Sequence, residues 1–145
     1  MTAPAPVRPK TPSFLRPALA LLAGLGIFVA IVFLGTIATF VIMGVKAEEA
    51  QHPSTVLLVA QLAVNGVAAL LAGFATGRMT WGRSLYTLFL LSLIPSMSSL
   101  IPVLRGSVGL VEPQWYLLAR PAVIMLGIVA GGVFERLRTD TSVAG

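Results

Sequence analysis

The sequence predicts an all-α membrane protein, built as a bundle of four transmembrane helices. Three stretches, 17–45, 53–77 and 84–104, contain no charged residue, and a fourth, 113–134, contains only Arg120. Each stretch reaches the ~20 residues that a helix needs to cross about 30 Å of hydrocarbon. Because unpaired backbone groups are costly in lipid, uninterrupted apolar runs of this length are expected to be helical.

The composition leaves little room for anything besides these spans. The chain has 145 residues, of which 57% are hydrophobic and 10% charged, and its mean hydropathy is +0.93. We therefore expect a disordered, proline-rich cytoplasmic tail at 1–16, a transmembrane domain at 17–134 and a short cytoplasmic tail at 135–145. Neither the tails nor the loops are long enough to bury a core of their own.

The four spans differ in what precedes and interrupts them. The first span, 17–45, follows basic residues, as the apolar h-region of a signal peptide does. It is about twice as long as an h-region and no A-x-A site follows it, which indicates a retained anchor.

The third span contains Pro95 and Pro102, and the fourth contains Pro121. Each proline frees the carbonyl four residues earlier, and nearby serines or water are expected to satisfy it.

The distribution of basic residues predicts the orientation. Four spans make two helical hairpins and put both tails on one side of the membrane. If the tails and the second loop are cytoplasmic, that side carries seven basic residues and the other side three, so the positive-inside rule places both termini in the cytoplasm. The seven are Arg8, Lys10, Arg16, Arg78, Arg83, Arg136 and Arg138, and the three are Lys46, Arg105 and Arg120. We expect a multi-pass protein of a bacterial inner (cytoplasmic) membrane.

Small residues recur at four-residue spacing in the spans, which lets helix backbones approach closely. They also indicate an internal repeat at an offset of 58 residues, which would relate two parallel hairpins; chance similarity of glycine-rich helices is the alternative. These stripes of small residues are expected either to pack the helices of the bundle against one another, or to form the contact with a second copy of the chain (a homo-oligomer) or with a partner membrane protein. The helix-packing candidates are Ala69, Gly73, Gly77, Gly127 and Gly131, with Gly26 and Ala30 similarly spaced in the first span.

Polar residues inside the spans gather at one depth. With cytoplasmic termini, Gln61 lies in the outer half of the second span and Asn65 near its centre. Ser96 and Ser99 share one face of the third span. Arg120 enters the fourth span on the outer side, where an unpaired charge is costly. These five residues predict a polar cavity that opens outward and binds an anionic or polar ligand.

A simpler interpretation of Arg120 is also open. Pro121 is suited to the first turn of a helix, so the fourth helix would begin near Arg120 and its guanidinium would reach up to lipid phosphates. The remaining residues up to Phe134 would then make a short span.

Few residues are suited to catalysis. The chain has no cysteine and one histidine, His52, beside a span, and none of the spans contains an acidic residue. We therefore expect no enzymatic activity, no metal site and no cofactor. Because the basic residues flank spans, we also expect no nucleic-acid binding.

Two functions agree with this composition. One is a non-catalytic subunit or assembly factor that docks partner membrane proteins through glycine and alanine faces. The other is a small channel, carrier or binding protein that uses the polar residues around Arg120.

Overall fold

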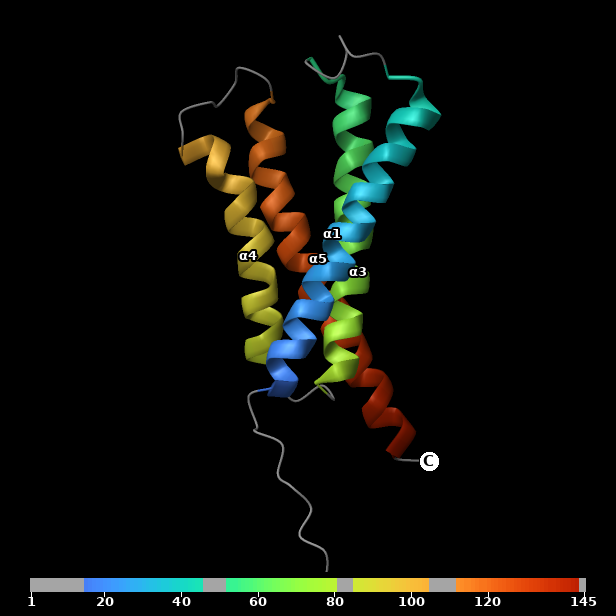
Figure 1. The fold of residues 1–145 in the computed structure, drawn as a ribbon, viewed down its shortest axis with the longest axis vertical. Coiled ribbons are helices and arrows are strands. Elements are labelled where there is room, and N and C mark those ends of the chain that lie inside the picture. The colour runs from blue at the N-terminus through green and yellow to red at the C-terminus, as the bar shows by residue number, and fades with distance from the viewer. Residues whose placement is uncertain (1–14, 46–51, 81–84, 105–111, 144–145) are drawn as a thin grey trace, which may run out of the picture.

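A computed structural model describes residues 15–45, 52–80, 85–104 and 112–143 of the chain. These residues form four helices and no strand: α1 (Leu15–Met43), α3 (Thr55–Met79), α4 (Leu85–Leu104) and α5 (Gln114–Val143), shown in Figure 1. The expectation of an all-helical protein is therefore confirmed for the described ranges.

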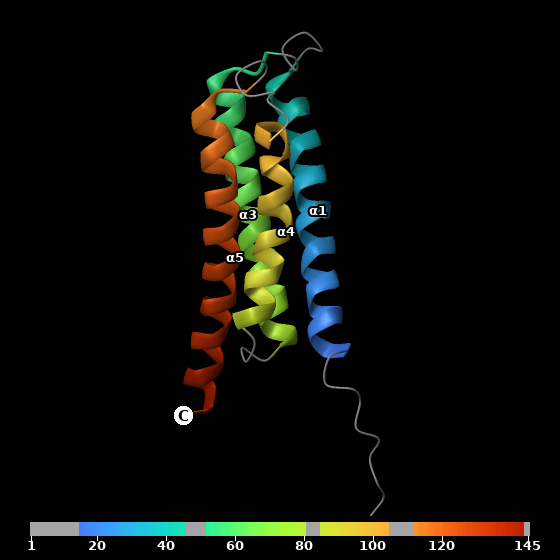
Figure 2. The same ribbon diagram turned by 90° about the vertical axis from the view of Figure 1, so that its left-hand side faces the viewer.

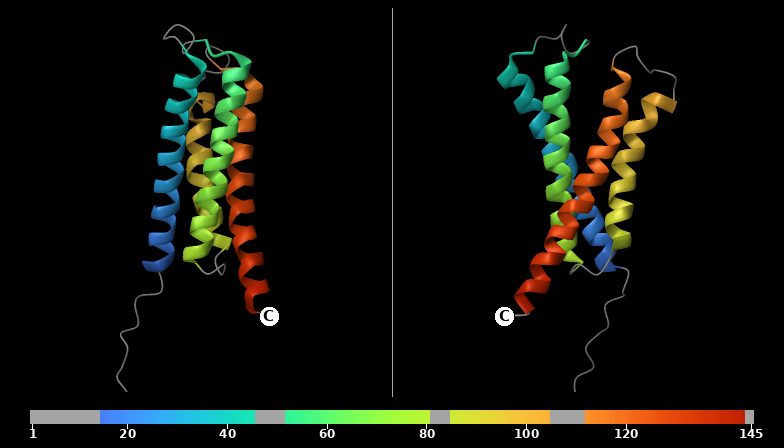
Figure 3. Two further views of the ribbon diagram at one scale, coloured as in Figure 1. Left: turned by 90° about the vertical axis from the view of Figure 1, so that its right-hand side faces the viewer. Right: turned by 180° about the vertical axis from the view of Figure 1, so that it is seen from behind.

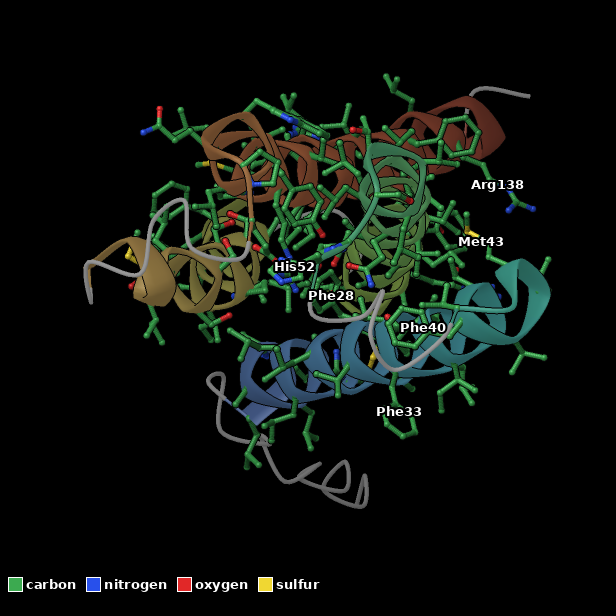
Figure 4. The ribbon with its side chains drawn as sticks, turned by 90° about the horizontal axis from the view of Figure 1, so that it is seen from above. Phe28, Phe33, Phe40, Met43, His52 and Arg138 are labelled. Atoms are coloured by element: carbon green, nitrogen blue, oxygen red, sulfur yellow. The ribbon has the colours of Figure 1, made fainter. Side chains whose placement is uncertain are left out.

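Three of these helices are long and apolar enough to cross a membrane: α1, α3 and the stretch 114–138 of α5. In α4 the apolar stretch Leu85–Ile101 is shorter. Many large apolar side chains point away from the bundle, as in a protein surrounded by lipid. Figure 4 shows the contrast within α1, where Phe28 points into the bundle and Phe33 points outward.

Local sequence signals explain where the helices end. Ser54 caps α3, its hydroxyl oxygen accepting a hydrogen bond from the Leu57 amide at 3.3 Å. After α1, Gly44 takes a left-handed conformation with φ of 61°. The Val45 amide then bonds to the Phe40 carbonyl and the Gly44 amide to the Val41 carbonyl, the pattern of a Schellman cap.

The last helix is longer than the span predicted at 113–134. It continues through 135–143, the segment expected to be a tail, and projects beyond the other helices at the bottom of Figure 1. Charge ends the lipid-compatible stretch but does not end a helix, because glutamate, arginine and leucine are good helix formers.

The helices form two antiparallel hairpins, α1 with α3 and α4 with α5 (Figures 1 and 2). We call the end where α3 and α5 begin the upper end, and the end where α1 and α4 begin the lower end. α3 and α5 run in the same direction and cross, and the two hairpins separate toward the upper end (Figure 3). The contact between α3 and α5 is the most extensive in the bundle.

Two glycines bring the backbones of α3 and α5 together where they cross. A Cβ on Gly73 would overlap the Ile128 carbonyl, and a Cβ on Gly131 would overlap the Leu70 carbonyl. The two contacts are equivalent, because Gly131 follows Gly73 by the same number of residues as Ile128 follows Leu70. α3 and α5 therefore contact each other in a two-fold-like manner about this point.

The other small residues of the two stripes also lie between α3 and α5. Ala69 contacts Gly127, and Gly77 faces Gly132 and the Cβ of Glu135. Ala69, Gly73 and Gly77 are all buried. These stripes are therefore occupied within the chain.

α1 and α4 pack on either side of this central pair. Gly24 of α1 lies against Thr76, whose hydroxyl donates to the Ala20 carbonyl at 3.3 Å. Gly132 of α5 lies against Leu88 of α4. An apolar cluster fills the interior: Phe28, Ala68, Ala69, Ala72, Leu88, Leu91, Ile124 and Ile128.

Replacing Gly73 or Gly131 by leucine should destabilise the bundle, because the new side chain would meet a backbone carbonyl of the facing helix. Overpacking of this kind costs about 1–3 kcal/mol or more. The measurement is thermal unfolding in a mild detergent. Gly26→Leu is the matched control, since a Cβ at Gly26 would meet nothing within 4 Å. Equal melting temperatures for all three variants would contradict the crossing described above.

Candidate functional site

A cluster of polar side chains joins α3 to α5 between their crossing point and the upper end. Tyr116 of α5 donates its hydroxyl to Oε1 of Gln61 on α3 at 3.3 Å. Tyr116 is fully buried and Gln61 is partly buried. This hydrogen bond connects the two hairpins directly.

Asn65 lies one turn below Gln61 on the same face of α3 and is 3% exposed. Its Nδ2 donates to the Gln61 backbone carbonyl at 2.7 Å. Its Oδ1 is buried, and nothing in the described part of the chain donates to it. A buried carbonyl oxygen without a partner costs about 1–3 kcal/mol, so Oδ1 is a position where a bound group would be stabilised.

Arg120 lies one turn below Tyr116 on α5, just as Asn65 lies one turn below Gln61 on α3. Gly127 of α5 lies against Ala69 of α3. In that register Arg120 is level with Leu62, three residues nearer the upper end than Asn65. Arg120 is partly buried, and its Nε is buried with no acceptor among the described residues. α5 begins at Gln114, which argues against the alternative that the helix starts near Arg120.

The serines of α4 are divided between two roles. Ser96 is 6% exposed and its hydroxyl is 3.4 Å from the carbonyl of Pro121, the residue that follows Arg120. Ser99 is buried but donates to the Ser96 carbonyl of its own helix at 2.7 Å. Hydrogen bonds thus join Gln61 to Asn65 and to Tyr116 of α5, and Arg120 lies one turn from Tyr116 on the same helix. Ser96 reaches this segment of α5, whereas the hydroxyl of Ser99 bonds within α4.

Among the described residues, no serine hydroxyl bonds to a carbonyl that a proline frees. Ser92 and Ser98 donate to Phe89 and Pro95, three residues back in the same helix. A helical serine reaches only the carbonyl three or four residues earlier. For Leu91, whose carbonyl Pro95 frees, those positions are Ile94 and Pro95, so no serine is placed to bond it from the same helix.

Tyr116 is the site residue that the sequence did not identify. Its neighbour Trp115 is 43% exposed, and the two rings meet edge to face with centroids 5.8 Å apart. Trp115 is thus exposed, whereas Tyr116 faces the interior. The sequence feature that could have identified Tyr116 is its position one helical turn before Arg120, which puts both residues on the same face of the helix.

A second buried polar residue lies at the lower end, where Glu135 is 7% exposed and packs on Gly77. It falls one residue outside the predicted span, which is why an acidic residue inside the bundle was not expected. His52 is exposed at the upper end and lies over the middle of the bundle seen from above (Figure 4). Within the described ranges, no three His, Asp or Glu side chains gather to hold a metal ion.

Comparisons with protein families, with curated proteins and with solved structures found no match to this chain.

Removing the Tyr116 hydroxyl should weaken the link between the hairpins. We expect Tyr116→Phe and Gln61→Leu each to lower stability, and the double variant to cost about 0.6 kcal/mol less than the sum, the usual size of such couplings in membrane proteins. The measurement is a double-mutant cycle from unfolding in detergent. Thr39→Val is the control, since Thr39 bonds only to Gly35 of its own helix. Strict additivity would show that the bond contributes nothing.

Proposed function

We propose that this protein is a non-catalytic membrane protein that binds an anionic or polar ligand at the cluster of Gln61, Asn65, Tyr116 and Arg120. One observation carries the proposal. A buried acceptor, Oδ1 of Asn65 on α3, and a buried donor, Nε of Arg120 on the neighbouring helix α5, both lack partners in the described structure.

The energetic argument follows from burial. An unsatisfied polar group costs more in a membrane than at a protein surface, because lipid offers neither donors nor acceptors. A guanidinium carries only donors, so an anion is its natural partner. No carboxylate within the described ranges is paired with Arg120, which leaves the charge available to a ligand.

We further propose that all four helices span the membrane, with both termini in the cytoplasm. α4 has 20 residues, which is about 30 Å of helix, and it lies alongside α5 (Figure 1). Arg16, Arg78, Arg136 and Arg138 belong to the lower ends of the helices, which favours a cytoplasmic lower end. A bacterial inner membrane is the expected location, and the polar cluster would then lie nearer the external side.

Reporter fusions test this topology. A fusion after Val143 and an insertion between Lys46 and Gln51 should report opposite sides of the membrane, because one helical span separates the upper from the lower end. Insertion in 81–84 should agree with the C-terminal fusion. A reporter at 46–51 on the same side as the C-terminus would contradict the arrangement.

Ligand binding is tested by titrating the purified protein with bicarbonate, phosphate and acetate in phosphatidylcholine nanodiscs. We expect a saturable change in Trp115 fluorescence with at least one anion. Arg120→Gln should weaken binding about tenfold or more, since it removes a charge-assisted hydrogen bond. Arg78→Gln, an exposed arginine at the lower end of α3, is the matched control. Absence of any saturable response would reject the proposal.

A second candidate, a subunit or assembly factor, is favoured by one surface of α1. Gly26 and Ala30 are exposed there, and nothing lies within 4 Å of a Cβ built on Gly26. A partner helix could approach this face closely. Co-purification of a stoichiometric partner in mild detergent, lost in Gly26→Leu, would favour this function over ligand binding.

A further inference from the structure

The buried polar atoms of the cluster that lack hydrogen-bond partners indicate more about the ligand than a negative charge. Asn65 directs Nδ2 to the Gln61 carbonyl, and this bond fixes which way round its amide lies. Oδ1 is therefore the atom left without a partner, and it only accepts hydrogen bonds. Whatever fills this position must bring a donor.

Arg120 has the opposite requirement. Its guanidinium has five N–H donors and no acceptor, and Nε is buried without a partner in the described structure. Both residues lie one turn below the Tyr116–Gln61 hydrogen bond, on helices that run in parallel. The cluster thus offers a buried donor and a buried acceptor on two neighbouring helices, with the donor three residues nearer the upper end in the register of the glycine contacts.

Anions differ in whether they satisfy both requirements. A halide, nitrate or a phosphodiester group brings acceptors to Arg120 but no donor to Asn65. Its negative charge would also lie near the partial negative charge of Oδ1. An oxyanion that keeps a proton, such as bicarbonate or dihydrogen phosphate, brings both. A polar lipid head group with an anionic phosphate and a hydroxyl carries the same combination.

We propose that the ligand of this cluster is an oxyanion that also carries a hydroxyl donor, with its charged oxygens on Arg120 and its hydroxyl on Oδ1 of Asn65. This inference rests on the proposed function, because it names the class of anion that the cluster binds. Sites that hydrogen-bond a ligand hydroxyl discriminate against analogues that lack it, since the buried acceptor is then left unpaired.

Bicarbonate and nitrate are a suitable pair of probes, because both are planar, singly charged anions and only bicarbonate carries a hydroxyl. Each is titrated at neutral pH into the full-length protein in phosphatidylcholine nanodiscs, whose head group has no hydrogen-bond donor. Trp81→Phe leaves Trp115 as the single emitter among the two tryptophans, and the Trp115 ring contacts Tyr116 of the cluster.

We expect the protein to bind bicarbonate about tenfold more tightly than nitrate. Asn65→Leu, similar in volume but without the acceptor, should reduce this ratio to about one while nitrate binding persists. Arg120→Gln should weaken both ions. The control variant Thr39→Val should leave the ratio unchanged, because the Thr39 hydroxyl bonds within α1. Melting temperatures establish that each variant is folded, and Asn65→Ala, which also removes the acceptor, provides a second variant if the leucine does not fold.

The outcomes separate the two proposals. If neither ion produces a saturable response, the proposed binding function fails. If both ions bind equally, or the ratio is unaffected by removing the acceptor in a folded Asn65 variant, the anion site stands and the hydroxyl requirement is overturned, with water as the partner of Oδ1. If phosphatidylglycerol nanodiscs abolish the bicarbonate response of wild type but not of Asn65→Leu, a hydroxylated lipid head group is the source of the same chemistry.

Discussion

The close crossing of α3 and α5 is the constraint on which the rest of the bundle depends. Membrane helices gain little from apolar burial against one another, because lipid is equally apolar, so the contact distance decides how much dispersion they recover. Gly73 and Gly131 let backbone meet backbone at this point, each against a carbonyl of the facing helix. Any side chain at either position would force the two hairpins apart. α1 and α4 are then held mainly through their contacts with this pair.

The crossing also determines where the polar cluster forms. The glycine contacts set the register of α3 against α5, and above them the Tyr116 hydroxyl reaches the side chain of Gln61. Asn65 and Arg120 each lie one turn below one of these two residues on the same helix. The apolar packing and the polar cluster therefore both belong to one helix pair, with backbone contact at the glycines and polar side chains between the crossing and the upper end.

The glycine stripes bear on the choice between the two functions. In the described structure, Ala69, Gly73, Gly77, Gly127 and Gly131 pack within the chain, so they are not free to receive a partner helix. A small-residue surface that remains exposed is the face of α1 that carries Gly26 and Ala30. Interaction with a partner and binding of a ligand would thus use different helices, and variants of one need not affect the other.

Much of this structure follows from the sequence because it depends on properties of single segments. Charge-free runs at 17–45, 53–77 and 84–104 mark helices whose bounds agree within about two residues with those observed. The spacing of Gly73 and Gly77 on α3, and the depths of Gln61 and Asn65, follow from the rise and period of a helix alone. The length of α5 was less predictable, because lipid-compatible composition and helix propensity end at different residues.

Tertiary structure alone decided how each helix is rotated about its axis and which face meets a neighbour. It turned Tyr116 into the interior while leaving Trp115 exposed, bonded the hydroxyl of Ser99 within α4, and buried Glu135 against Gly77. Spacing shows which residues share a face, but not which faces meet, because that depends on the shapes of all four helices packed together. The burial of two unpartnered polar atoms, on Arg120 and Asn65 of neighbouring helices, arises in the same way, because it depends on how α3 and α5 cross and not on the sequence of either helix alone.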